Sequence, residues 1–146
     1  MSFVYTPAKT KLAKATADFD ILDVRVILVM SDTTADTDQD AATIAAITTL
    51  DEYDGSGYAE IDGANLTVAE DAPNNRAEIT IDAGNFGTTV GVGTRQAVGA
   101  VVYAFVDGTP GNDWPIAFID SGGFPFDGNG GQINFTPNAE GLLQVT

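Results

Sequence analysis

The stretch DVRVILVM, residues 23–30, decides the fold of this 146-residue chain. Its last five residues are all apolar, and three of them are β-branched. An unbroken apolar run rich in β-branched residues is typical of a strand that is buried on both faces. We therefore predict that residues 23–30 form the first core strand.

A hairpin is predicted further along the chain. Residues 58–68 and 76–81 have the composition of strands, and residues 71–75, with Pro73 before two asparagines, have the turn chemistry that joins them. The second strand alternates strictly between apolar and polar residues. This alternation predicts a sheet with one face on the core and one face in water.

Four more segments complete the predicted strands: residues 97–106, the most apolar part of the chain, then 114–120, 132–136 and 141–145. Turn residues separate them at regular intervals. Many short strands at such spacing predict a mainly β fold, an antiparallel β-sandwich of jelly-roll or immunoglobulin-like type. We expect a single domain over residues 1–146, with one or two short helices.

The two predicted helices are short. Thr6 followed by Pro7 is a helix-start signal, and good helix formers occupy residues 8–15. Asp40 is placed to cap a second helix that ends at Leu50 and carries isoleucines three residues apart on one face.

The chain contains neither histidine nor cysteine. The usual general base at neutral pH, the commonest metal ligand and the thiol nucleophile are therefore all missing. A carboxylate pair for glycoside hydrolysis remains open as an alternative, although no pair is singled out. The glycine-rich residues 84–93 lack the lysine of a phosphate-binding loop and indicate a flexible or tightly turning connection. We expect no enzyme activity and no cofactor.

Charge limits the choice of partner. The chain has 21 acidic and 6 basic residues, a net charge of −15, which makes nucleic acid and anionic membranes poor partners. Half of the basic residues are Lys9, Lys11 and Lys14. Residues 1–16 could thus dock on an acidic neighbour, or the lysines could lie on an ordinary solvated helix face. With no long apolar run and no signal-peptide pattern, we expect a protein made and kept in solution.

The aspartates Asp36, Asp38 and Asp40 have the spacing that opens an EF-hand calcium loop. The rest of the motif is absent, because Ala41 stands where glycine is needed and Ile47 where a bidentate glutamate is needed. A looser calcium site at these three aspartates stays open. The alternative is a solvated acidic loop.

Two phenylalanines, Phe124 and Phe126, lie in the glycine-rich segment 122–128. They are either tucked over the end of the core or presented to a partner as anchors. Trp114 is predicted to be a core residue. If it were exposed together with Tyr53 and Tyr58, these rings could instead form a platform on which sugars stack.

Several short motifs occur in a fixed order along almost the whole chain: KLAK (11–14), DVRVILVM (23–30), GSGY (55–58), NNR (74–76), VVY (101–103), WPIAFID (114–120) with GG (122–123), and NAEGLL (138–143). In this order and spacing they resemble the small phage virion proteins of the head-decoration, or capsid cement, type. The resemblance implies a β-sandwich without catalysis that sits on an assembled particle, commonly as a homotrimer clasping capsid subunits.

We therefore expect a virion protein, assembled in the host cytoplasm, whose partner is the major capsid protein or another virion protein. The contact elements predicted are the first 14 residues and the loop of Phe124 and Phe126. The alternative is an adhesion or carbohydrate-binding module associated with a fibre or tail.

Overall fold

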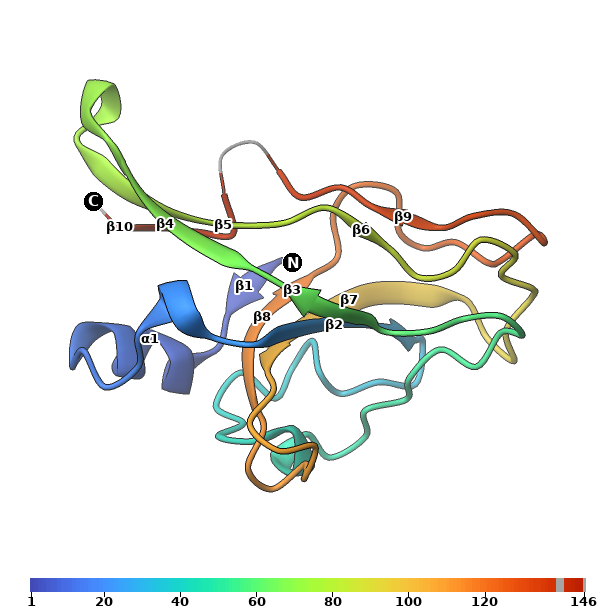
Figure 1. Ribbon diagram of the computed structural model, residues 1–146. Coiled ribbons are helices and arrows are strands. Elements are labelled where there is room, and N and C mark those ends of the chain that lie inside the picture. Colours follow the sequence, from blue (N-terminus) through green and yellow to red (C-terminus); the bar gives the residue numbers. More distant parts are fainter. Residues whose placement is uncertain (139–140, 146) are drawn as a thin grey trace.

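The computed structural model describes residues 1–138 and 141–145, and its centre is a five-stranded antiparallel sheet (Figure 1). The strand order is β1-β8-β7-β2-β3. The strands are β1 (Phe3–Val4), β8 (Trp114–Ile119), β7 (Ala97–Ala104), β2 (Val24–Met30) and β3 (Ile61–Ala64). The prediction of a mainly β, antiparallel fold is confirmed.

Strand β2 lies in the interior of the sheet, as its sequence predicts. It pairs with β7 from Val24 opposite Ala104 to Met30 opposite Ala97. Every residue of β2 except Arg25 is buried. Both faces of the sheet are covered: the loop 31–50 lies on one side, and β5, β6 and β9 lie on the other (Figure 1). Burial on two faces explains why the apolar run of β2 does not alternate.

The covering layer gives the fold a sandwich-like arrangement. It contains a three-stranded sheet in the order β10-β5-β4 and a two-stranded sheet of β6 and β9. These strands are β4 (Leu66–Asp71), β5 (Arg76–Ile81), β6 (Gly84–Asn85), β9 (Asn134–Phe135) and β10 (Leu143–Val145).

The predicted hairpin is confirmed, with two differences at its first strand. Strands β4 and β5 pair in continuous register and are joined by the 3₁₀ turn Ala72–Asn74. The strand expected over residues 58–68 begins only at Ile61, and Asn65 divides it into β3 and β4. This division lets one continuous segment pair with β2 in the central sheet and then with β5 in the covering layer.

The first helix forms, but its start differs from the prediction. Helix α1 (Thr6–Ala13) is preceded by Tyr5 at the cap position, so Thr6 lies inside the first turn and does not cap the helix. Tyr5 is fully buried, and its hydroxyl donates to the carbonyl of Ala35 at 2.8 Å. Ala8 is also buried. The N-terminal segment is therefore built into the fold and is not a free arm.

The prediction of a helix over residues 40–50 is wrong. Only a 3₁₀ turn, Ile44–Ala46, forms there, and another lies at Phe19–Ile21. The amide groups of Ile44 and Ala45 donate to the carbonyls of Asp113 and Pro110 and not to their own segment. Five of the residues 43–49 are β-branched threonine or isoleucine, which lowers helix propensity. Long-range hydrogen bonds and burial of the isoleucines therefore outweigh the local tendency to form a helix.

The glycine-rich loops are closely packed at one end of the molecule. Gly91 donates its amide to the carbonyl of Ser56 at 2.8 Å. A Cβ added to Gly128 would overlap the carbonyl oxygen of Gly91 and lie 2.6 Å from that of Val90. Of the two interpretations left open for residues 84–93, the structure supports the tightly turning one.

Among the residues described, none of the helices has the length and apolar character needed to cross a membrane.

Candidate functional site

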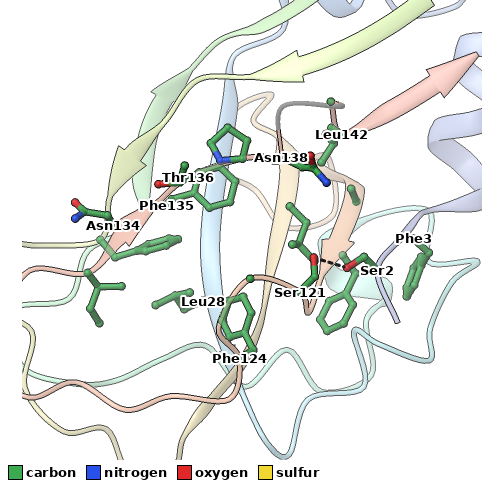
Figure 2. Close-up of a pocket in the computed structure, with 18 of the residues that line it drawn as sticks. Ser2, Phe3, Leu28, Ser121, Phe124, Asn134, Phe135, Thr136, Asn138 and Leu142 are labelled. Carbon is green, nitrogen blue, oxygen red and sulfur yellow. Dashed lines mark hydrogen bonds between the residues drawn. The ribbon is translucent and has the colours of Figure 1, made fainter. Parts of the chain in front are cut away.

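A pocket of about 500 Å³ lies between the five-stranded sheet and the segment 133–138 (Figure 2). Strands β1, β2 and β8 supply one side of it through Phe3, Leu28 and Phe118. The covering layer supplies the other side, where Phe135 of β9 faces the hollow. The pocket thus depends on four segments that are far apart in the sequence.

The lining is strongly aromatic. Six of the chain's eight phenylalanines contribute to it: Phe3, Phe86, Phe118, Phe124, Phe126 and Phe135. The rings form three contacting pairs, with centroid distances of 5.6 Å for Phe3 and Phe118, 5.2 Å for Phe124 and Phe126, and 6.2 Å for Phe86 and Phe135. Paired rings of this kind give apolar walls.

Phe124 and Phe126 are both half-buried, so their side chains are neither fully enclosed in the core nor fully exposed to a partner. Their rings stack on each other, and both line the pocket. Phe126 is fixed by two backbone hydrogen bonds with Ala97, of 2.8 and 3.0 Å. The sequence thus identified two residues of a site whose other walls come from elsewhere.

The polar groups of the pocket are neutral. Ser2, Ser121, Asn134, Thr136 and Asn138 lie in the lining, and no charged side chain of the described residues does. The hydroxyls of Ser2 and Ser121 are 3.4 Å apart (Figure 2). Because no carboxylate lines the pocket in this part of the chain, it offers no acid and base pair for glycoside hydrolysis. Its chemistry suits binding of an uncharged apolar group.

The remaining lining residues were missed, although one local signal pointed to them. In the segment predicted as a strand over residues 132–136, Ile133 and Phe135 alternate with polar residues, and both line the pocket. Phe86 gave no such signal, because it lies between glycines in a segment without periodicity.

The three lysines of the N-terminal segment do not act as one group. Lys9 and Lys14 are exposed on and beside α1, whereas Lys11 is half-buried with its Nζ 4.9 Å from the ring centre of Trp114. This geometry is a cation–π contact. Only Lys9 and Lys14 are therefore available to a partner, and neither lines the pocket.

The three calcium candidates, Asp36, Asp38 and Asp40, are not arranged around a common cation site. Asp36 and Asp40 are exposed, and one carboxylate oxygen of Asp38 accepts from the amide of Thr48 at 2.8 Å and the hydroxyl of Thr34 at 2.7 Å. These bonds, the amide first, hold the pKa of Asp38 below its usual value. No three acidic side chains of the described residues converge in a way that could hold a metal ion.

Trp114 and Tyr53 are buried, at 7% and 2% exposure, and Tyr58 is half-buried. The prediction of Trp114 as a core residue is confirmed. The Tyr53 hydroxyl donates to Asp127 at 2.6 Å and accepts from the amide of Gly128 at 2.8 Å, which ties the glycine-rich loops together. These rings are not available as a platform for sugars.

Tyr53 also favours the ionised form of its partner Asp127. Its hydroxyl, with the amide of Gly93 at 2.9 Å, holds the pKa of Asp127 below the usual value. Asp127 therefore acts as a structural acceptor between two loops.

Comparison of the chain with protein-family models, with curated proteins and with solved structures gave no match.

Proposed function

We propose that this chain is a structural virion protein that binds the outer surface of a phage capsid and stabilises it as a decoration or cement protein. The observation that carries a protein-binding role is the aromatic pocket, in whose lining the described residues include no charged side chain. Apolar and aromatic anchors that fill such pockets dominate the energy of protein interfaces. The phage capsid as partner rests on the resemblance of the ordered sequence motifs to head-decoration proteins.

The charge distribution supports a second contact through helix α1. Lys9 and Lys14 are exposed on a protein whose net charge is −15, so they are suited to an acidic patch on the partner. Each copy needs to contribute only a modest interface, because many copies on one particle bind with avidity. A homotrimer, as the resemblance implies, would multiply each contact by three.

The first test is whether the protein belongs to the particle. Phage particles made by the genome that encodes this chain are purified and analysed by mass spectrometry, and the purified protein is sedimented with capsids that lack it. We expect the chain in the particles at a high copy number and its co-sedimentation with the capsids. Absence from the particles together with a lack of co-sedimentation would contradict the proposal.

A charge-matched pair of variants tests the role of the lysines. The double variant Lys9→Gln/Lys14→Gln loses two positive charges, and the control Thr88→Glu/Gln96→Glu gains two negative charges at exposed positions in the segment 86–96. Two exposed ion pairs contribute about 0.2–1 kcal/mol each, so we expect about two- to thirtyfold weaker capsid binding for the lysine variant alone. Equal binding by both variants would place the interface away from α1.

A further inference from the structure

We propose that the aromatic pocket is a binding site for one large, uncharged apolar side chain of a protein partner. This inference deepens the proposed function, on which it rests for the partner being a virion protein. The volume of about 500 Å³ lies in the range of pockets that take small-molecule ligands, about 300–1,000 Å³, and therefore has room for a whole large side chain. Its walls are the three phenylalanine pairs, which are held by the packing of both layers.

The charge of the lining decides the class of occupant. No charged side chain of the described residues lines this pocket, so an ammonium or carboxylate group would lose its water there without gaining a charged partner from them, which is costly. The carboxylate of Asp120, which follows β8 and precedes the lining residue Ser121, is already bonded to the N-terminal amino group and to the hydroxyl of Ser2. An uncharged aromatic or branched aliphatic group avoids this cost.

The rim favours a side chain carried by a polypeptide over a free apolar molecule. Ser2, Ser121 and Thr136 place hydroxyl groups around the opening, where the amide and carbonyl groups of a peptide can hydrogen-bond. Strand β1, which contributes Phe3 and Val4 to the pocket, is one of the two edge strands of the central sheet. An extended partner segment can therefore lie along this edge while one of its side chains enters the pocket.

The net charge adds a feature of the partner segment. A chain with a charge of −15 attracts positively charged surfaces. We therefore expect the apolar side chain that enters the pocket to be flanked by lysine or arginine, whose charges remain outside in water.

The test is a titration of the full-length, isotope-labelled protein followed by NMR. The probe is N-acetyl-phenylalanine amide, and the charged comparison probes are N-acetyl-lysine amide and N-acetyl-glutamate amide. We expect saturable shifts with the phenylalanine probe at Phe124, Phe126 and Phe135, and affinities at least tenfold weaker for both charged probes. No shift at the pocket with the phenylalanine probe would overturn the proposal.

Pocket-filling variants make the assignment specific. Ser121→Trp and Thr136→Trp add bulk at two exposed positions of the rim, and Thr88→Trp adds the same bulk at an exposed position outside the lining. We expect at least tenfold weaker probe binding for one or both rim variants and unchanged binding for the control. Two rim variants guard against loss of folding in either. Probe binding that both folded rim variants retain would contradict the site.

A third probe distinguishes a free small molecule from a protein side chain as the occupant of the pocket. If the neutral dye 1-N-phenylnaphthylamine binds in the pocket and the capped phenylalanine does not, the site takes a free small molecule and the assignment to a side chain is wrong. All these titrations use the isolated protein, so their result is independent of capsid binding. A failed sedimentation with a successful titration would contradict the capsid proposal alone.

Discussion

Replacing Gly128 by alanine tests the closest backbone contact in the glycine-rich loops. The added Cβ would overlap the carbonyl oxygen of Gly91 and lie 2.6 Å from the carbonyl oxygen of Val90. Both obstacles are backbone atoms, which cannot move aside by changing a rotamer. Overpacking costs about 1–3 kcal/mol, and contact with backbone places this change near the upper end. We expect the free energy of unfolding to fall by about 3 kcal/mol.

The matched control is Gly111→Ala. Nothing lies within 4 Å of a Cβ at Gly111, and this residue is exposed in the turn between β7 and β8. An alanine there removes conformational freedom from the unfolded chain at no cost in contacts. We expect this variant to match the wild type or to be more stable by up to about 1 kcal/mol.

Urea denaturation followed by the fluorescence of Trp114 measures both variants. With slopes of about 1–3 kcal/mol per molar urea, a loss of 3 kcal/mol lowers the midpoint by at least about 1 M. Unfolding exposes Trp114, which is buried in the folded protein, so its emission reports the transition. If Gly128→Ala and Gly111→Ala had the same midpoint, the close approach of the loops would be refuted.

Two further substitutions test polar contacts of the core. Tyr5→Phe removes only the hydroxyl that donates to the buried carbonyl of Ala35, and loss of such a donor costs about 1–3 kcal/mol, so the urea midpoint should fall without a change in slope; an unchanged midpoint would show that this bond adds no stability. Asp127→Asn tests the carboxylate bonded to Tyr53. Because its pKa is lowered in the folded state, its stabilising contribution is complete above the unfolded pKa of about 3.9 and is lost as the pH falls through the folded pKa. The midpoints of wild type and variant should differ at pH 7 and converge as the pH falls below the unfolded pKa of about 3.9, whereas a constant difference would contradict this assignment.

The strands were predictable because their signal is local. Burial on both faces leaves a continuous apolar run in β2, and burial on one face leaves the alternation of β5, in which Ile79 and Ile81 are buried. The hairpin turn needed only the chemistry of residues 71–75. Each of these features depends on neighbours within a few positions.

Local sequence patterns could not exclude a helix over residues 40–50. Isoleucines three residues apart face one way on a helix, but Ile44 and Ile47 also reach the core from a 3₁₀ turn followed by extended backbone. The deciding hydrogen bonds come from Pro110 and Asp113, more than 60 positions away. Local periodicity contains no information about such partners.

Prediction of the pocket from the sequence is limited in the same way, because its walls come from distant segments. Phe124 and Phe126 stood out because aromatic residues are unexpected among glycines, yet the sequence left open whether they face inward or outward. The answer depends on Phe3, Leu28 and the segment 133–138, which only the tertiary structure brings together.

The N-terminal segment is already folded into the protein, so binding through it has a different entropy cost from binding through a free docking arm. A disordered arm loses conformational entropy when it binds, and this cost reduces its affinity. Here Tyr5 and Ala8 are already buried, so α1 presents Lys9 and Lys14 from a fixed position. Removing residues 1–14 would also delete β1 and part of the core, so loss of binding after truncation would not identify a contact. Substitution of the two exposed lysines separates binding from folding, because neither side chain is buried.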